Sequence, residues 1–233
     1  MKPRGMRVRA IRRETPWSAV VQLDAGATAF AFKAGQAATL GLPEGEPTAY
    51  SVASDPESVR QTRTIDFLVG TTRDGHFGAH LSGLAVGSAV WVTGPFGRFL
   101  LPDKVDGRPL VFIAGGTGIA PLRSMMRSVL AGPDVPPMTL LYSAHSHDGF
   151  AFVDEFRRWS RAGRVRLSLT ATGHAGDGWR GRRGRIRRSW IAPLVRHSDT
   201  LAFVCGPPPF VEEVSGLLTA AGVSPDRIMR ERY

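Results

Sequence analysis

The sequence predicts two parts of different fold class: an N-terminal antiparallel β-barrel, then a C-terminal α/β domain with a doubly wound parallel sheet. In the N-terminal part, short alternating or β-branched stretches are separated by turns rich in glycine and proline, which favours a small barrel. After residue 108, apolar runs alternate with helical patterns, as in a parallel sheet covered on both faces. A polar, turn-rich stretch at 101–109 separates the two patterns. We therefore expect one domain over residues 1–103 and a second over residues 108–233.

The strands expected in the N-terminal part are short. They lie at 7–13, 19–23, 64–70 and 89–93, and the expected turns lie at 34–36, 41–45, 74–75 and 94–97. Glycine and proline favour these turns because glycine adopts left-handed conformations and proline fixes its own φ.

The C-terminal part alternates strand and helix. Leu110–Ala114 is uniformly apolar, which is typical of a parallel strand buried on both faces. Further strands are expected at 138–143, 165–170 and 201–205, and helices at 121–131, 152–162 and 209–221. This alternation predicts βαβ units and hence a parallel sheet.

Composition narrows the class of protein. Hydrophobic residues make up 42% of the 233 residues, enough for a buried core, and no run approaches the ~20 apolar residues of a membrane-spanning helix. The basic start, Met1–Arg9, is not followed by the apolar core of a signal peptide, so we expect a cytoplasmic protein with no membrane span. With Cys205 as its single cysteine, the chain cannot form an internal disulfide or hold a cysteine-ligated iron–sulfur cluster by itself.

Positive charge is concentrated in the second part. Residues 1–107 carry 12 Lys and Arg against 10 Asp and Glu, whereas residues 108–233 carry 18 against 10, so the excess rises from 2 to 8. Such a field attracts anionic partners: nucleotide phosphates, an acidic protein or nucleic acid. Composition alone does not choose among these.

A glycine-rich loop follows the first strand of the C-terminal part. The sequence Gly115-Gly116-Thr117-Gly118-Ile119-Ala120-Pro121 lets the backbone turn sharply, and Pro121 suits the first helical position. Free amides at a helix start bind pyrophosphate, so this strand–loop–helix order predicts a nucleotide site. The alternative is an ordinary tight turn.

A second signal, Phe203–Phe210, has the same logic, because a buried strand ends in Cys205 and a Gly206-Pro207 turn leads into a helix. Ligands of open α/β sheets bind at the carboxyl ends of strands, where Thr117 and Cys205 would lie. The alternative for Cys205 is a small hydrophobic residue in the core.

Several motifs together resemble the ferredoxin–NADP reductase superfamily, in a form without its own iron–sulfur domain. They occur in the order and spacing of that family and span almost the whole chain. The motifs are TAYSVAS at 48–54, GPFG at 94–97, GGTGIAP at 115–121, WRGRRGRI at 179–186 and CGPPPF at 205–210.

The resemblance implies a barrel that binds FAD and an α/β domain that binds NADH or NADPH, so that electrons pass from the pyridine nucleotide to flavin and then to a separate acceptor. Tyr50 would stack on the isoalloxazine, Ser51 would hydrogen-bond near the hydride-accepting nitrogen, and Cys205 would lie beside the nicotinamide. The implied cofactor-binding residues are Thr48, Tyr50, Ser51, Val52, His76, Phe77, Gly78, Gly116, Thr117, Gly118, Pro121, Ser143, His145, Arg180, Cys205, Gly206, Pro207 and Tyr233.

The last residues resemble the Glu-x-Tyr terminus of the plant-type reductases. The resemblance implies that Tyr233 covers the flavin face that the nicotinamide must reach. It also implies that Glu231 takes part in a charge and proton relay, which makes Ser51, Cys205 and Glu231 the candidate catalytic residues. The alternative is that these last residues are frayed.

Two positions depart from the family pattern. Thr48 replaces the arginine that grips the flavin pyrophosphate, and Gly78 replaces a serine or threonine of the phosphate loop. Backbone amides around Phe77 or the side chain of His76 are the remaining candidates for that contact. The departures leave FMN open as a substitute for FAD. They also leave open a non-catalytic nucleotide-binding or regulatory subunit that has lost stable flavin.

Six arginines crowd the range 180–188. Arg180 or Arg182 could meet the 2′-phosphate of NADPH, but His145 and His147 stand where an arginine would favour NADPH, so the choice between NADH and NADPH stays open. The arginine run is either a solvated loop, a docking surface for an acidic electron-transfer protein such as a ferredoxin, or a nucleic-acid site. We expect no nucleic-acid partner because no recognised module is present. The histidines lack companion ligands, so we expect no zinc site.

Overall fold

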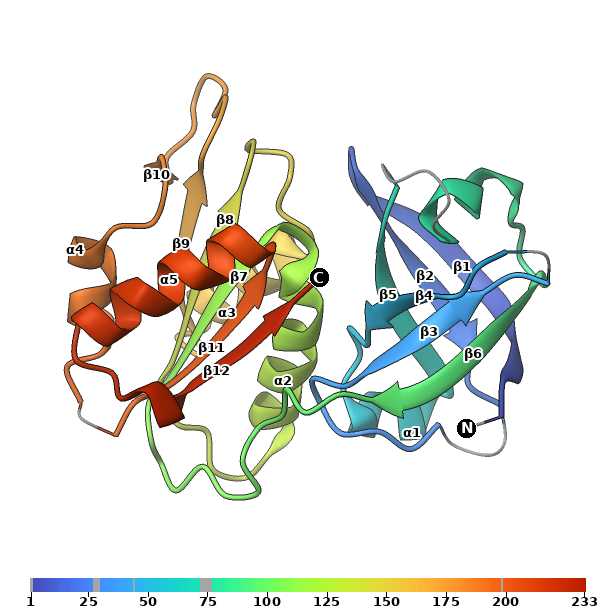
Figure 1. Cartoon of the computed structure of the whole chain (residues 1–233), viewed down its shortest axis with the longest axis horizontal. Helices are drawn as coiled ribbons and strands as arrows, with labels where there is room; N and C mark the ends of the chain where they lie inside the picture. Colours follow the sequence, from blue (N-terminus) through green and yellow to red (C-terminus); the bar gives the residue numbers. More distant parts are fainter. Residues whose placement is uncertain (1, 27–29, 44, 72–76, 198) are drawn as a thin grey trace. The chain divides into compact units, whose positions relative to one another are not determined.

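The computed structural model describes residues 2–26, 30–43, 45–71, 77–197 and 199–233. The chain divides into two compact units, each built around its own sheet (Figure 1). The first unit comprises Met1–Leu101 and Arg123–Ala131, and the second comprises Pro102–Leu122 and Gly132–Tyr233. The expected boundary at 103–108 stays a prediction, and it does not include the return of Arg123–Ala131 to the first unit.

The first unit is a six-stranded antiparallel sheet with the order β4-β3-β6-β1-β2-β5. A bridge between Val52 and Phe67 joins the end of β4 to β5, so the sheet curls into a barrel. The strands are β1 (Arg4–Thr15), β2 (Ser18–Asp24), β3 (Ala37–Gly41), β4 (Thr48–Ser51), β5 (Thr64–Gly70) and β6 (Ala89–Phe96), with helix α1 (Pro56–Thr62) and 3-10 helix η1 (Phe77–Gly83).

Alternation along the strands builds the barrel core. On β2 the side chains of Val21 and Leu23 are fully buried, and on β5 those of Ile65 and Phe67 are fully buried as well. Successive strand residues point to opposite faces, so every second residue of these strands enters the core. The antiparallel barrel predicted from this pattern is confirmed.

Strand β6 continues further than the sequence predicts. We expected a turn at 94–97, but β6 runs through Phe96. Its pairing with β3 shifts register between Ala37 and Thr39, so the extra residues are absorbed as an irregularity of the ladder. The expected turn at 74–75 lies outside the described residues.

The second unit is a six-stranded parallel sheet with the order β10-β9-β8-β7-β11-β12. Its strands are β7 (Leu110–Gly115), β8 (Met138–Ala144), β9 (Arg166–Ala171), β10 (Arg182–Arg183), β11 (Leu201–Gly206) and β12 (Ile228–Arg232). The helices are α2 (Ile119–Ala131), α3 (Val153–Arg161), α4 (Arg188–Ile191) and α5 (Pro208–Ala220), with 3-10 helices η2 (Gly116–Gly118), η3 (Ala192–Leu194) and η4 (Pro225–Arg227). Residues Arg123–Ala131 of α2 belong to the first unit.

Helices cover both faces of this sheet. Leu141 of β8 shares a buried cluster with Val214 of α5, whereas the next residue, Tyr142, contacts Phe156 of α3 with ring centroids 6.3 Å apart. Neighbouring strand residues face opposite sides, so α5 and α3 lie on opposite faces. The doubly wound parallel sheet predicted from the sequence is therefore confirmed. No helix of the described residues is long and apolar enough to cross a membrane.

Two chain segments differ from expectation in this unit. Helix α2 begins at Ile119, so Pro121 lies inside the first turn rather than at the first position; proline is tolerated there because its nitrogen needs no partner. The alternative of a frayed end is wrong, because Arg230–Arg232 belong to β12, which pairs in parallel with β11.

Candidate functional site

Strand β4 carries the residues expected to hold the flavin. Tyr50 is partly exposed, and its ring meets the edge of the Phe77 ring with centroids 6.1 Å apart. The hydroxyl of Thr48 accepts a hydrogen bond from the Phe77 amide at 3.2 Å. The structure thus brings Thr48, Tyr50 and Phe77 together, and Ser51 follows on the same strand with a partly exposed side chain.

The neighbouring Val52 is part of the barrel core. Its side chain is fully buried, and its amide donates to the Gln36 carbonyl at 2.9 Å. Its place is therefore fixed by the barrel.

The backbone leaves no room for a side chain at Gly78. A Cβ added there would come within 1.9 Å of the Gly70 carbonyl oxygen. The serine or threonine of the family pattern therefore does not fit this path of the chain. His76, the other predicted residue of this loop, lies outside the described residues.

The residues of this strand fit a flavin ring, because Tyr50 offers a partly exposed aromatic ring and Ser51 a partly exposed hydroxyl on a strand that is paired to β3. The contact to the flavin diphosphate is less well provided. The Thr48 hydroxyl is bonded to the Phe77 amide, and it does not replace the two hydrogen bonds that an arginine guanidinium would give at this position.

The glycine loop and the end of β11 pack against each other in the second unit. Strand order changes direction at β7, with β8 on one side and β11 on the other, which is the point where open α/β sheets bind ligands. A Cβ added to Gly118 would come within 2.4 Å of the Cys205 carbonyl oxygen, so only glycine permits this approach. Thr117, Gly118, Cys205 and Gly206 are thus brought together, as expected for a pyrophosphate cradle at a strand end.

Tyr233 reaches into the same loop. Its hydroxyl donates to the Gly115 carbonyl at 2.9 Å, and a Cβ on Gly116 would lie 3.1 Å from that hydroxyl. Although the residue is 46% exposed, burial of its hydroxyl end raises the pKa of the phenol, and hydrogen bonds with Thr117 and Gly118 offset only part of this effect.

Cys205 and Glu231 face each other across adjacent strands. The two residues are paired in register on β11 and β12, and the thiol donates to the Glu231 Oε2 with a sulfur–oxygen distance of 3.9 Å. Burial, followed by the charge of Glu231, raises the pKa of the Cys205 thiol well above its ordinary value. The thiol is therefore neutral at pH 7, and it suits packing and hydrogen bonding better than attack on a substrate.

The remaining predicted residues lie around the strand ends of the same sheet. Ser143 is buried and pairs in register with Gly115. His145 packs over Gly173, where an added Cβ would come within 2.4 Å of the imidazole. Arg180 is exposed.

Pro207 precedes α5 as its N-terminal cap residue, with no side-chain cap hydrogen bond. Arg182, the other candidate for a 2′-phosphate, donates to the Ser168 hydroxyl at 3.2 Å and lies 4.6 Å from the centre of the Trp190 ring. No group of three metal-binding side chains occurs among the residues that the structure describes.

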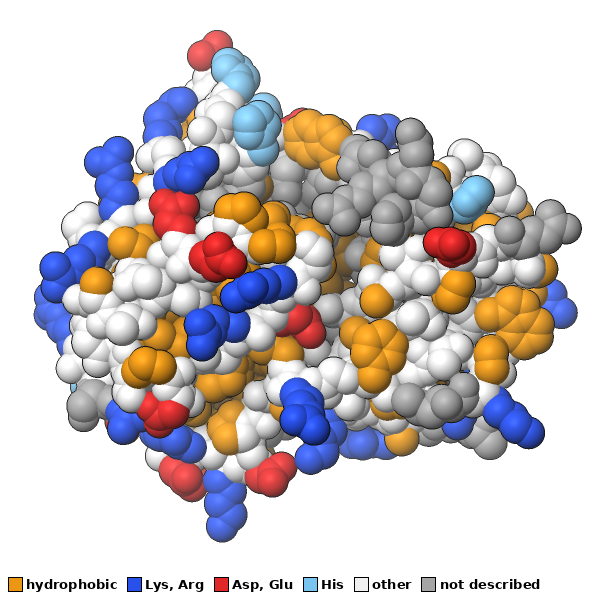
Figure 2. Space-filling model, viewed as in Figure 1, with side chains coloured by type: hydrophobic (Ala, Val, Ile, Leu, Met, Phe, Trp, Pro, Cys, Tyr) orange, Lys and Arg blue, Asp and Glu red, His pale blue; other side chains and the backbone are white. Residues whose placement is uncertain are grey.

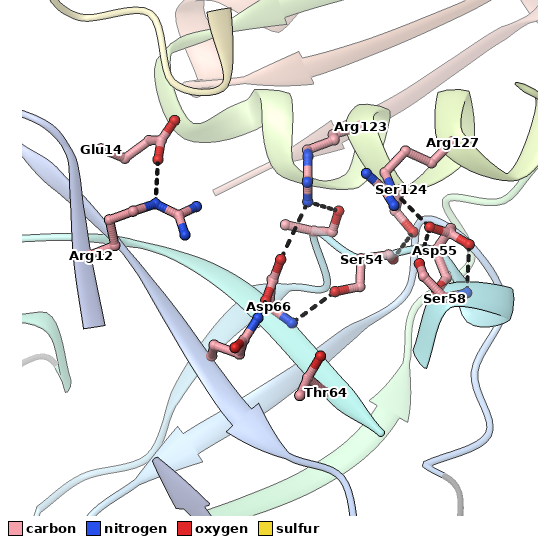
Figure 3. A network of polar contacts seen from close by, with 12 residues as sticks. Arg12, Glu14, Ser54, Asp55, Ser58, Thr64, Asp66, Arg123, Ser124 and Arg127 are labelled. Carbon is pink, nitrogen blue, oxygen red and sulfur yellow. Dashed lines mark hydrogen bonds and ion pairs between the residues drawn. The ribbon is translucent and has the colours of Figure 1, made fainter. Parts of the chain in front are cut away.

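Sequence reasoning missed a set of polar side chains on α2. Arg123, Ser124 and Arg127 bind the chain that directly follows the Tyr50–Ser51 strand (Figure 3). The contacts join positions about 70 residues apart in the sequence, with separations of 70 to 72, so no local pattern signals them. The one available hint is two arginines four positions apart on one helix face.

Comparisons with known proteins match both units. The family model of the oxidoreductase FAD-binding domain matches residues 14–100, and that of the oxidoreductase NAD-binding domain matches residues 112–216. These matches assign an FAD-binding domain and an NAD-binding domain to the two parts of the chain.

The curated relatives include reductases and electron transfer components. A "Ferredoxin–NADP reductase B" from Sorangium cellulosum is 30% identical over 245 residues, covering 100% of this chain and 98% of the relative. A "Toluate 1,2-dioxygenase electron transfer component" from Pseudomonas putida is 30% identical over 207 residues, covering 87% of this chain. The chain spans 59% of the length of that relative, and 60% of that of a propane 2-monooxygenase reductase component from Mycolicibacterium goodii.

A solved structure agrees with these relatives. The crystal structure of a cytochrome P450 reductase from Amycolatopsis superposes with a TM-score of 0.85 at 27% identity, covering 99% of this chain and 70% of that protein. The same family is indicated by the two domain matches, by the Sorangium relative matched over nearly its whole length, and by the antiparallel and parallel sheets. This chain therefore belongs to the ferredoxin–NADP reductase superfamily of FAD- and NAD(P)-binding oxidoreductases.

Proposed function

We propose that this chain takes a hydride from NADH or NADPH onto bound FAD and passes the electrons to a separate acceptor, such as a ferredoxin or an oxygenase component. The observation that carries the proposal is the presence of an FAD-binding and an NAD-binding domain in one chain, each with its expected ligand-facing residues at a strand end. Relatives named as electron transfer components and reductase components support a separate acceptor.

Bound FAD supplies the redox chemistry, because it accepts a hydride and releases electrons one at a time. The chain supplies position. In this proposal the ring of Tyr50 supports the isoalloxazine, and the hydroxyl of Ser51 donates a hydrogen bond to its edge. Both side chains are partly exposed on β4, whose pairing with β3 holds them in place.

In the second unit, we assign the pyridine nucleotide to the glycine loop. The close packing of Gly118 on Cys205 places the loop amides at a strand end, where they can hold pyrophosphate. The neutral thiol of Cys205 would line the nicotinamide pocket without attacking it, and Glu231 would set the charge beside that thiol. Tyr233 would leave the loop when the nucleotide enters.

We also propose an acidic electron-transfer protein as the partner. Basic side chains are spread over the second unit on the face shown in Figure 2, with acidic ones among them, and residues 108–233 carry the larger excess of positive charge. Within the arginine run, Arg185 is paired with Glu213 at 3.2 Å and Arg182 is stacked on Trp190. The exposed side chains of Arg180, Arg183, Arg187 and Arg188 are left to attract the partner's carboxylates.

The test is NAD(P)H-dependent reduction of ferricyanide by the purified chain, with and without added FAD. We expect turnover that requires FAD and that saturates with one of the two pyridine nucleotides at lower concentration. Equal, FAD-independent rates with protein and with buffer alone would contradict the proposal.

Thr48 and Gly78 favour a second candidate, a non-catalytic nucleotide-binding subunit without stable flavin. Both positions lack the diphosphate contacts of the family pattern, and Gly78 has no space for a side chain. This candidate predicts that the chain binds NAD(P)H but neither FAD nor FMN. Equilibrium dialysis against each compound separates the two candidates.

A further inference from the structure

The middle of helix α2 is hydrogen-bonded to the chain that follows the Tyr50–Ser51 strand. Three consecutive positions, 53–55, each accept a hydrogen bond from one side chain of the helix (Figure 3). The contacts are Arg123 Nη1 to the Ala53 carbonyl at 2.8 Å, Ser124 Oγ to the Ser54 carbonyl at 2.5 Å, and Arg127 Nε to Asp55 Oδ2 at 2.7 Å. All six residues belong to the first unit.

Arg123 is a buried charge with fixed partners. It is 8% exposed, and its guanidinium also lies 3.6 Å from Asp66 Oδ2. A buried guanidinium is tolerated only when it is paired and hydrogen-bonded, so its contact with the Ala53 carbonyl is held in one geometry. Asp66 is held in turn, because it accepts from Gln22 at 2.9 Å and its amide donates to the Ser54 hydroxyl at 2.8 Å.

Arg127 meets a carboxylate that is equally constrained. Asp55 accepts from the Ser58 amide at 2.9 Å as the N-cap of α1, and from the Ser58 hydroxyl. Burial alone would raise the pKa of Asp55, but the hydrogen bonds from Ser58 and Arg127 outweigh it and lower the pKa below its ordinary value. Asp55 is therefore charged at neutral pH and available to Arg127.

These contacts complete the support of the strand backbone. Ser51 pairs with Ala37 on one side, and the Val52 amide donates to Gln36. The Ala53 amide donates to the Asp66 carbonyl at 2.8 Å, which leaves the carbonyls of positions 53 and 54 to α2. Because these carbonyls lie two and three residues after Ser51, the contacts hold the backbone that leads out of β4 in one position.

We propose that Arg123 is a positioning residue for the flavin, with Ser124 and Arg127 in support. It acts through the Ala53 backbone and not by touching the cofactor, and it keeps the Tyr50 ring and the Ser51 hydroxyl in the geometry that the isoalloxazine requires. This inference rests on the proposed function, because it takes β4 as the flavin strand.

The test compares FAD binding by the full chain with Arg123→Met and Arg157→Met variants. Arg157 pairs with Asp154 on the exposed side of α3, in the second unit, so its variant loses one arginine and one ion pair without touching β4. We expect Arg123→Met to bind FAD about tenfold more weakly and to shift the visible absorption bands of the bound flavin. Arg157→Met should match wild type, and Arg123→Lys, which keeps the charge, should recover part of the affinity.

The variant Val214→Ala tests whether a general loss of stability is enough to weaken FAD binding. It removes buried side-chain volume from α5 in the second unit. At a temperature where both proteins are folded, Val214→Ala should keep the wild-type flavin spectrum. If Val214→Ala weakens FAD binding as much as Arg123→Met does, or if Arg123→Met binds FAD like wild type with an unshifted spectrum, the inference is overturned.

Should Arg123→Met fail to fold, Ser124→Ala takes its place because it removes one hydroxyl alone. We then expect about threefold weaker FAD binding, and unchanged binding would overturn the inference. Absence of FAD binding by the wild-type chain would instead contradict the proposed function, so the two failures are distinguishable.

Discussion

The hydroxyl of Tyr233 lies in the loop to which we assign the pyridine nucleotide. Its bond to the Gly115 carbonyl and its closeness to Gly116 place a side chain of the chain itself where the pyrophosphate would be held. A ligand that enters this loop must first break that contact, so the contact lowers the apparent nucleotide affinity.

Tyr233→Phe removes the hydrogen bond and keeps the ring. We expect NAD(P)⁺ to bind about threefold more tightly to this variant, because vacating the loop no longer breaks a hydrogen bond. Isothermal titration of NADP⁺ and NAD⁺ measures the change, with Trp91→Phe, an exposed aromatic of β6, as the control. Unchanged or weaker binding would show that the hydroxyl does not compete with the nucleotide.

Cys205 is expected to be unreactive in the folded protein. Burial and Glu231 raise the pKa of the thiol, so very little thiolate exists at pH 7 to 8, and the side chain is only 1% exposed. A chromogenic disulfide reagent should therefore label the native chain far more slowly than the chain unfolded in guanidinium. Comparable labelling rates in the two states would contradict this burial.

Among the elements, regular strands were predictable and short or irregular ones were not. The patterns of β2, β5, β7 and β11 indicate strands because apolar side chains repeat every second residue or continuously. In β3, Thr39 is the one residue with a strong strand preference, whereas alanine and glycine disfavour strands, and β3 exists because β4 and β6 pair with both of its edges. β12 has two apolar residues followed by three charged ones, which gives no strand pattern, and its pairing with β11 decides its structure.

In the candidate site, residues within short motifs were predictable from the sequence, and contacts between distant segments were not. Thr117 was predicted as a site residue because it lies in a glycine-rich turn after a strand, and Tyr50 because its motif resembles that of the family. The lack of space at Gly78 was not predictable, because it depends on the chain folding back onto Gly70. The contacts of Arg123 were not predictable either, because their partners lie about 70 residues away in the sequence. Motifs report local geometry, and the contacts that support β4, the strand to which we assign the flavin, are not local.

Asp55, which caps helix α1 and pairs with Arg127, makes the stability of the folded chain depend on pH. The lowered pKa of Asp55 means that its charged form stabilises the folded state above the ordinary carboxyl range, and that this stabilisation is lost as pH falls through the folded pKa. In the variant Asp55→Asn, a good cap residue stays but the ion pair with Arg127 is lost, at a cost of about 1 kcal/mol at pH 7.

Chemical denaturation between pH 7 and about pH 3 tests this expectation. The free energy of unfolding of wild type should exceed that of Asp55→Asn at pH 7, and the two should converge below about pH 4. A difference that persists or grows in acid would contradict the assignment of the charge to Asp55.

Across the molecule, the charge distribution favours an anionic partner for the second unit, whose residues 108–233 carry 18 basic against 10 acidic residues. Exposed charges act at long range and are screened by salt, so they change encounter rates more than the chemistry that follows. Electron transfer to a protein acceptor should therefore depend on ionic strength, whereas hydride transfer within the chain should not.

The double variant Arg183→Glu/Arg187→Glu should raise the KM for an acidic ferredoxin several-fold and weaken its salt dependence between about 50 and about 200 mM salt. Lys2→Glu/Arg4→Glu makes the same change of net charge in the first unit and should leave the KM near the wild-type value. Steady-state kinetics with ferredoxin and with ferricyanide give the comparison. Equal effects of the two double variants would assign the attraction to net charge and not to the arginine run.

The most direct measurement is an absorption spectrum of the purified chain after addition of FAD and removal of free cofactor, recorded before and after anaerobic addition of NADH or NADPH. We predict a yellow protein with flavin bands that bleach on addition of the pyridine nucleotide and return on exposure to air. A chain that stays colourless after FAD is added, or a yellow chain whose bands do not respond to either nucleotide, would contradict the account.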